Sequence, residues 1–169
     1  MNAEQVETIR WGFIGLGRMA ANVAGDWANQ RNGELYAVAS RSVERAEKFA
    51  SRFGAAKAYG SYAELLGDPQ VDAVYVATPH SVHTRDGLAV IAAGKPLLME
   101  KAFTATLDGA QQLVHAAREA KLFAMEAMWT RFQPAIVKTR ELINEGAIGE
   151  VRTVHVDLEI GRASCRERV

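Results

Sequence analysis

A glycine-rich turn near the amino terminus has the residue types and spacing needed to hold a diphosphate. Gly15, Gly17 and Ala20 follow a short apolar strand and match the pattern G-x-G-x-x-G/A. Gly15 permits a sharp turn, Gly17 lets a phosphate approach the backbone, and the small Ala20 allows the next helix to pack closely on the strand. The first N–H groups of that helix attract anions. We therefore expect dinucleotide binding through Gly15, Leu16, Gly17, Arg18 and Met19, the alternative being a glycine-rich turn in another α/β domain.

The end of the second predicted strand indicates which dinucleotide binds. NAD sites usually place Asp or Glu at this position, where the carboxylate binds the ribose hydroxyls. This chain has Ser40 and Arg41 there, with Arg45 one helical turn later. Hydroxyl and guanidinium groups suit a 2′-phosphate, which Arg can bind in a bidentate manner. The sequence thus predicts NADP. NAD is the alternative, in which the two Arg side chains only solvate the start of a helix.

Glu100 and Lys101 follow another buried strand and form the strongest candidate for proton transfer. A Lys beside a nicotinamide can donate a proton to a carbonyl, or accept one from an alcohol, while the cofactor carries the hydride. Desolvation and a positively charged nicotinamide are both expected to favour the neutral amine of Lys101. We expect Glu100 to orient Lys101 or to contact the cofactor. The alternative interpretation is a surface Lys–Glu pair at the end of a strand.

A third group of polar residues follows the strand 71–77. Ligands of doubly wound sheets bind at the carboxyl edge of the strands, so we expect Ala77, Thr78 and Pro79 to contact the cofactor and His83 to line the cleft. Neighbouring histidines raise the question of a metal site. However, no Cys or carboxylate completes a ligand set at suitable spacing, and we predict no metal.

Strands alternate with helices over the first ~125 residues, which predicts a Rossmann-type, doubly wound parallel sheet with helices on both faces. Each expected strand is short and apolar. These strands cover residues 8–14, 34–40, 58–59, 71–77, 96–99 and 122–125. The main expected helices between them cover residues 19–29, 43–53, 61–66 and 107–120, with a further helix that ends at residue 93.

The chain changes character after Glu126. We predict that residues 1–127 form a dinucleotide-binding domain and that residues 128–159 begin an α+β substrate domain, whose remainder is missing. This second part is expected to contain a helix over 134–145 and a strand over 151–158. The strand alternates strictly, as in an antiparallel sheet with one face in water.

Residues 160–169 show neither strand alternation nor helical periodicity, and they match one reading frame of a sequencing adapter. We interpret them as a non-native tail, the alternative being a genuine basic tail. The only cysteine, Cys165, lies in this tail, so no disulfide or thiol chemistry is expected of the native part.

Composition limits the partners of this chain. It has 169 residues, a formal net charge of zero and no long basic run, so we expect neither nucleic acid nor a membrane surface as a partner. No apolar run approaches ~18 residues, and the polar start of the chain does not resemble a secretory signal. A cytoplasmic location is therefore expected.

Together the motifs resemble the Gfo/Idh/MocA family, which includes glucose–fructose oxidoreductase and inositol dehydrogenase. The resemblance spans residues 8–158 and departs from the usual Glu-Lys-Pro only in Ala102. It rests on the glycine turn, on residues 39–42, on Ala77-Thr78-Pro79 with His83, and on Gly94-Lys95-Pro96 before Glu100-Lys101. Residues 126–132 look like the subgroup of dihydrodiol dehydrogenases and NADP-linked aldose dehydrogenases.

The resemblance implies reversible hydride transfer between NAD(P) and a hydroxyl or carbonyl group of a sugar, inositol or diol. It implies that Lys101 is catalytic, that Trp129 and Arg131 lie against the cofactor, and that the missing domain supplies an Asp and a His. The full-length form is then a homo-oligomeric enzyme, whereas this fragment is expected to be inactive. Two alternatives are a non-catalytic NAD(P)-binding regulatory protein and a reductase of another substrate class on the same fold.

Overall fold

The computed structural model describes residues 8–155, and this described part divides into two compact units, one up to Met128 and one from Trp129. The predictions made for residues 160–169 and for Cys165 lie outside the described residues. Within residues 8–155, no helix is long and apolar enough to cross a membrane.

The first unit is built on one six-stranded sheet with the strand order β3-β2-β1-β4-β5-β6, in which every neighbouring pair is parallel. This is the order of doubly wound dinucleotide-binding folds, so the predicted fold class is confirmed. The strands are β1 (Ile9–Ile14), β2 (Gly33–Ala39), β3 (Lys57–Tyr59), β4 (Ala73–Val76), β5 (Leu97–Met99) and β6 (Ala124–Glu126).

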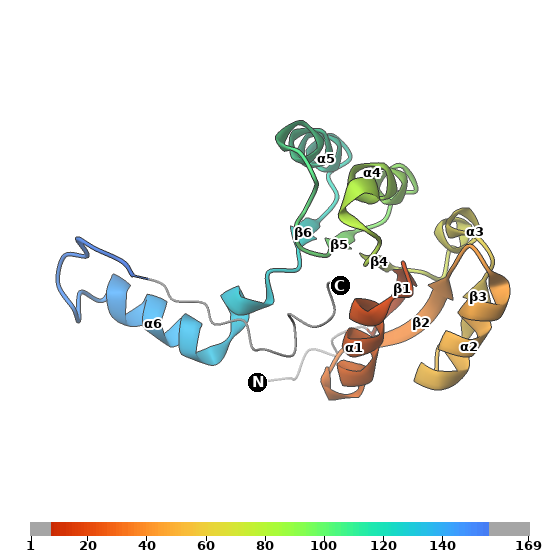
Figure 1. Ribbon diagram of the computed structural model, residues 1–169, viewed down its shortest axis with the longest axis horizontal. Coiled ribbons are helices and arrows are strands. Elements are labelled where there is room, and N and C mark those ends of the chain that lie inside the picture. Colours follow the sequence, from red (N-terminus) through yellow and green to blue (C-terminus); the bar gives the residue numbers. More distant parts are fainter. Residues whose placement is uncertain (1–7, 156–169) are drawn as a thin grey trace, which may run out of the picture. The chain divides into compact units, whose positions relative to one another are not determined.

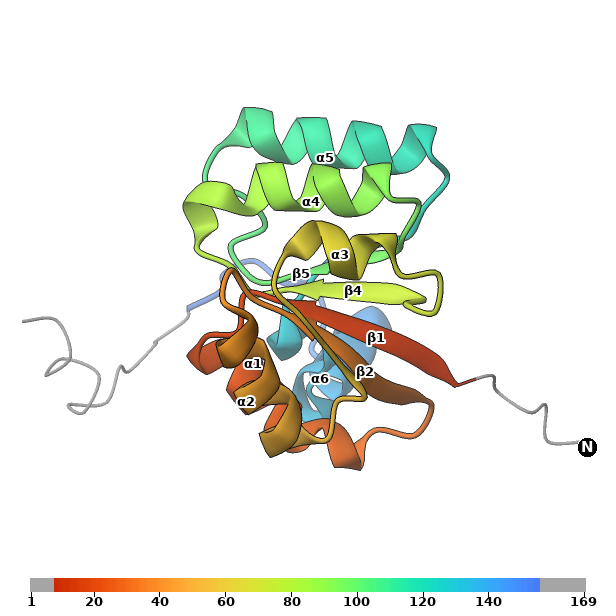
Figure 2. The same ribbon diagram turned by 90° about the vertical axis from the view of Figure 1, so that its right-hand side faces the viewer.

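Helices cover both faces of this sheet. Figures 1 and 2 show α1 and α2 on one face, and α3, α4 and α5 on the other. Their bounds are α1 (Arg18–Asp26), α2 (Val43–Phe53), α3 (Tyr62–Gly67), α4 (His83–Ala92) and α5 (Leu107–Glu119), with 3₁₀ turns η1 (Trp27–Asn29) and η2 (His80–Val82). The described part of the second unit contains η3 (Trp129–Phe132) and α6 (Pro134–Asn144).

Two apolar clusters fill the space between the sheet and these helices. Successive strand residues point to opposite faces, so Phe13 packs toward α1 and α2 while Ile14 packs toward the α4 side. All four residues of β4 are buried, as expected for a strand with helices on both faces. The central strands therefore hold the loops at their carboxyl ends on a rigid base.

The strand predicted over residues 151–158 is not seen in the described residues. Residues 151–155 have no regular secondary structure, and residues 156–158 lie outside the described range. A strand is stabilised by the ladder that it forms with a neighbour, and no described strand pairs with this segment. An alternating pattern alone does not produce a strand without that partner.

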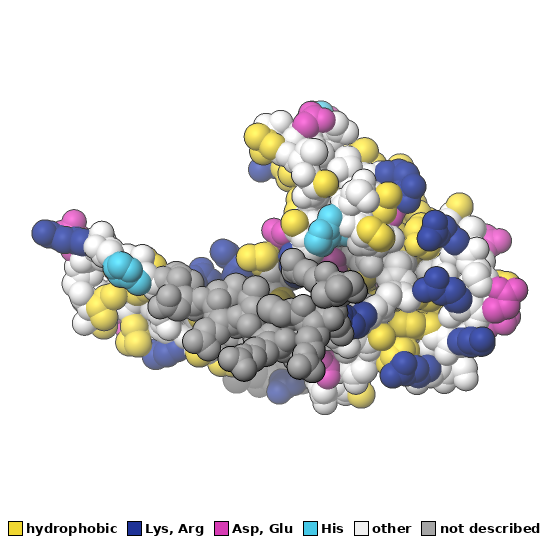
Figure 3. Space-filling view, viewed as in Figure 1, with side chains coloured by type: hydrophobic (Ala, Val, Ile, Leu, Met, Phe, Trp, Pro, Cys, Tyr) yellow, Lys and Arg dark blue, Asp and Glu magenta, His cyan; other side chains and the backbone are white. Residues whose placement is uncertain are grey.

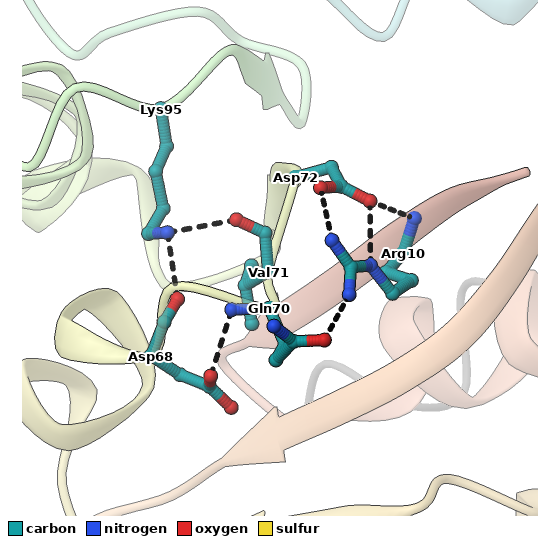
Figure 4. Close-up of polar contacts among 6 residues, drawn as sticks. All are labelled: Arg10, Asp68, Gln70, Val71, Asp72 and Lys95. Atoms are coloured by element: carbon teal, nitrogen blue, oxygen red, sulfur yellow. Dashed lines mark hydrogen bonds and ion pairs between the residues drawn. The ribbon is translucent and has the colours of Figure 1, made fainter. Parts of the chain in front are cut away.

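Polar contacts join the strands at their amino ends. Arg10 on β1 forms a bidentate ion pair with Asp72 before β4, with both N–O distances at 2.9 Å. The buried ammonium group of Lys95 donates to the carbonyl oxygens of Asp68 and Val71 at 2.9 and 2.7 Å (Figure 4). Burial lowers the pKa of Lys95. These contacts fix the starts of β1, β4 and β5 at the edge opposite the carboxyl ends.

The carboxylate of Asp68 accepts from several donors, and its side chain is only 5% exposed. It accepts hydrogen bonds from Tyr59 Oη at 2.7 Å, from Gln70 N at 2.9 Å and from Lys57 Nζ at 3.0 Å. Burial by itself would raise the pKa of Asp68, but these donors outweigh it and lower the pKa to about 2. The charged form of Asp68 thus stabilises the folded state.

Acid is expected to remove this stabilisation. Because the folded pKa of Asp68 lies below its ordinary value of 3.8, the contribution is complete above about pH 4 and is lost as the pH falls toward 2. Asp68→Asn should lower the free energy of unfolding by about 1–2 kcal/mol at pH 7. Urea unfolding followed by circular dichroism between pH 7 and pH 2 measures this.

The substitution Asp26→Asn, at an exposed carboxylate, serves as the control and should leave the wild-type pH dependence intact. If Asp68→Asn and the wild type lose stability equally between pH 4 and pH 2, Asp68 does not carry the effect.

Candidate functional site

A pocket of about 510 Å³ opens at the carboxyl ends of the central strands and lies wholly within the first unit. It brings together segments that are far apart in the sequence: the glycine turn, the end of β2, the loop after β4 and the loop after β5. Its lining residues are Gly15, Leu16, Gly17, Arg18, Met19, Ser40, Arg41, Arg45, Tyr62, Ala77, Thr78, Pro79, His80, Glu100 and Lys101. The residues predicted from four separate motifs therefore share one cavity.

The glycine turn forms the central part of the pocket wall. Gly15 has a positive φ of 82°, and a Cβ atom at this position would lie 2.5 Å from the backbone nitrogen of Thr78. Gly17 precedes α1, whose first turn has no side-chain cap. Because the cap residue Gly17 has no side chain to accept from this helix start, its N–H groups are suited to an anion in the pocket.

The end of the pocket next to β2 carries positive charge. Ser40 directly follows β2, Arg41 lies between β2 and α2, and Arg45 lies in the first turn of α2. The hydroxyl of Ser42 caps this helix by accepting from the backbone N–H of Arg45 at 3.3 Å. On the face seen in Figure 3, Lys and Arg side chains gather over the part of the first unit that holds α2. This end of the pocket favours a ligand with an additional phosphate.

Two further residues line the pocket that the sequence reasoning had not assigned to it, Tyr62 and His80. Tyr62 begins α3, and burial raises the pKa of its phenol, as does the nearby charge of Asp86. The signal that could have placed Tyr62 is the capping box of Ser61 and Glu64, which marks a helix start directly after β3.

Glu100 and Lys101 close the other end of the pocket, and they differ in exposure. The Glu100 side chain is buried, whereas Lys101 is exposed. The expected desolvation of the Lys101 ammonium group stays a prediction. The backbone N–H of Glu100 donates to the carbonyl of Val76 at 2.9 Å, which continues the pairing of β4 with β5 into the pocket.

His83, expected in the wall of the cleft, is instead fully buried at the start of α4. Its Nε2 lies 2.7 Å from the carbonyl oxygen of Thr78, and its Nδ1 lies 2.8 Å from that of Ala102. His80 Nε2 lies 2.9 Å from the carbonyl oxygen of Lys101. The two histidines thus join the loop after β4 to the loop that carries Lys101. His83 does so from a buried position outside the pocket lining.

The remaining predicted site residues, Trp129 and Arg131, lie on η3 in the second unit. Trp129 is exposed. Their contact with a cofactor stays a prediction. Within residues 8–155, no group of three or more His, Cys, Asp or Glu side chains could hold a metal ion.

Comparison with known proteins places this pocket in a family context. Residues 9–128 match the family model described as "Oxidoreductase family, NAD-binding Rossmann fold". The D-xylose 1-dehydrogenase (NADP(+)) of Hypocrea jecorina is 45% identical over 93% of this chain and 43% of its own length. The trans-1,2-dihydrobenzene-1,2-diol dehydrogenase of Danio rerio is 39% identical over 88% of this chain and 45% of its own length.

Solved structures agree with this relationship. An NAD binding oxidoreductase from Klebsiella pneumoniae superposes with a TM-score of 0.81 at 34% identity, over 85% of this chain and 40% of that one. A 3-ketoreductase from Actinomadura kijaniata in complex with NADP gives a TM-score of 0.77 at 34% identity, over 86% of this chain and 47% of that one. The chain thus spans less than half the length of these relatives.

The two glycines of the turn allow a matched test of the pocket. Gly15→Ala should lower the free energy of unfolding by about 1–3 kcal/mol and abolish dinucleotide binding, because its Cβ meets backbone atoms. Gly17→Ala should leave stability within about 0.5 kcal/mol, because its Cβ would meet only the Gly15 carbonyl oxygen at 4.0 Å.

Binding should nevertheless weaken at least about tenfold in Gly17→Ala, because the added methyl group keeps a phosphate from the backbone. Thermal unfolding and calorimetric titration with NADPH measure both effects. Wild-type affinity in both variants would mean that the turn does not hold the dinucleotide.

Proposed function

Because this chain belongs to the oxidoreductase family with an NAD-binding Rossmann fold, the Gfo/Idh/MocA family, we propose that it is the cofactor-binding part of an NADP-dependent oxidoreductase. In this proposal residues 1–127 form the dinucleotide-binding domain and residues 128–159 begin the substrate domain. The observation that carries the proposal is the single pocket that joins the glycine turn, the Arg41–Arg45 end and the Glu100–Lys101 end.

The order of these groups along the pocket predicts how NADP lies in it. The pyrophosphate lies at the glycine turn, where α1 begins. The 2′-phosphate lies against Ser40, Arg41 and Arg45. The nicotinamide half then lies over the ends of β4 and β5, close to Glu100 and Lys101, because the two halves of the sheet bind the two halves of a dinucleotide.

The bound nicotinamide would supply the hydride chemistry, and Lys101 would move the proton. As an ammonium group Lys101 donates a proton to the carbonyl oxygen of the substrate, and as an amine it accepts a proton from the hydroxyl group in the reverse direction. Glu100 holds the adjacent backbone, and its burial keeps it in one orientation. In the proposal Trp129 and Arg131 contact the cofactor from the second unit.

The relatives named above support a sugar or diol as the class of substrate, since their names describe oxidation of D-xylose and of a dihydrodiol. As the sequence indicated, the full-length form in this proposal is a homo-oligomeric, cytoplasmic enzyme. The chain by itself should bind the cofactor and turn over little substrate, because it spans less than half of each relative.

The preference for NADP over NAD tests the proposal most directly. Arg41→Ala should weaken NADPH binding about 10- to 100-fold and leave NADH binding within about twofold, because only NADPH has the 2′-phosphate and its loss costs a charge-assisted hydrogen bond. Calorimetric titration of the wild type and of Arg41→Ala with NADPH and with NADH measures the ratio of the two affinities.

Arg52→Ala, near the end of the helix that follows Arg41 and outside this pocket, is the control and should change neither affinity. Tighter binding of NADH than NADPH by the wild type would overturn the NADP assignment. A folded wild type that binds neither cofactor would overturn the proposed function.

Lys101 can be tested in the whole enzyme. Lys101→Met should lower kcat about 10²- to 10⁴-fold, the usual loss on removing a general acid or base. NADPH affinity should fall much less than kcat, because the Lys101 side chain is exposed at one end of the pocket. Turnover of D-xylose followed by NADPH absorbance, beside a cofactor titration, separates these effects. Unchanged kcat would exclude Lys101 as the group that takes up the hydroxyl proton.

A further inference from the structure

The buried carboxylate of Glu100 is held by two donors that the proposed reaction does not use. One oxygen accepts from the phenol of Tyr75 at 2.8 Å, and the other accepts from the backbone N–H of Lys101 at 3.2 Å. Glu100 is 6% exposed and still lines the pocket. A buried carboxylate without such donors would be costly, so these two bonds decide which way it faces.

Tyr75 is a rigid donor. It lies in β4, which pairs with β1 on one side and β5 on the other, and it is 1% exposed. Its ring packs against Phe13 with the ring centroids 4.7 Å apart. Burial raises the pKa of the phenol, and the hydrogen bond to Glu100 raises it further. Tyr75 therefore stays protonated and donates to Glu100 throughout the neutral range.

Two bonds leave part of the acceptor capacity of Glu100 unused. An ionised carboxylate offers about four lone-pair positions, and within residues 8–155 two of them are occupied, by Tyr75 and the backbone. The others are available to a ligand in the pocket. In the proposed orientation the neighbouring ligand groups are the ribose hydroxyls and the carboxamide N–H groups of the nicotinamide half, which are donors.

We propose that Tyr75 is a positioning residue, whose phenol turns the Glu100 carboxylate so that it accepts a hydrogen bond from the nicotinamide half of the cofactor. The inference rests on the proposed NADP function and adds a residue that contacts no ligand. Through the same carboxylate, Tyr75 also sets the backbone of Lys101, since one Glu100 oxygen accepts from that N–H.

Tyr75→Phe tests this, because it removes one hydroxyl group and keeps the ring that packs on Phe13. The probes are NADPH and adenosine 2′,5′-bisphosphate, which has the adenosine half and the 2′-phosphate but no nicotinamide. Tyr75→Phe should weaken NADPH binding about tenfold and leave bisphosphate binding within about twofold. A purely structural role would weaken both ligands alike.

Tyr59→Phe is a matched control, since it removes the other phenol that donates to a buried carboxylate, Asp68, outside the pocket. It should lower stability and leave the affinities for both probes unchanged. If Tyr75→Phe binds NADPH like the wild type, or loses both ligands equally, the positioning role is excluded. A wild type that binds the bisphosphate but not NADPH would also exclude it.

A double-mutant cycle keeps the inference testable if Tyr75→Phe is unstable. Glu100→Gln should weaken NADPH binding by itself, and adding Tyr75→Phe should then weaken it by less than twofold, because Tyr75 acts through Glu100. Additive losses would show that Tyr75 acts independently of Glu100 and would overturn the proposal. A folded wild type that binds neither probe would instead refute the NADP function.

Discussion

The close approach of the turn after β1 to the backbone after β4 is the constraint on which the site depends. Only a residue without a side chain fits at Gly15, where a Cβ would lie 2.5 Å from the nitrogen of Thr78. The N–H of Ala77 donates to the Ile14 carbonyl at 2.9 Å, and the N–H of Glu100 donates to the Val76 carbonyl at the same distance. The pairing of β1, β4 and β5 thus continues past the strands. This continuity brings the glycine turn and the Glu100–Lys101 loop to the carboxyl edge of the sheet.

The two edges of the sheet have different tasks. At the amino edge, bidentate pairing and buried donors tie the strand starts together, as the contacts of Asp72 and Lys95 show. At the carboxyl edge the loops separate and leave a cavity. Loops at the ends of rigid strands tolerate many residue types, so they can carry binding residues without disturbing the packing of the core. The polar contacts that join the strand starts therefore lie apart from the pocket.

A tyrosine phenol donates to a buried carboxylate at both edges of the sheet. Tyr59 and Asp68 form one such pair outside the pocket, where further donors lower the pKa of the carboxyl group and stabilise the fold. Tyr75 and Glu100 form the other at the floor of the pocket, where the carboxylate keeps unused lone pairs. In each pair the phenol offsets the cost of burying a charge. We proposed that the Glu100 carboxylate accepts from the cofactor, whereas the donors around Asp68 stabilise its charge in the fold.

The local pattern of the sequence determined the type of fold and the position of most pocket residues. The glycine spacing, the short apolar strands and the polar residues that follow them predicted the parallel sheet and most of the residues that share the pocket, since these features depend on neighbours in sequence. Tertiary structure decided the rest. The burial of His83, the Tyr75–Glu100 bond and the exposure of Lys101 depend on which strand lies beside which and on the face to which each side chain points. A linear pattern does not contain that pairing, because residues 25 positions apart meet only when the sheet forms.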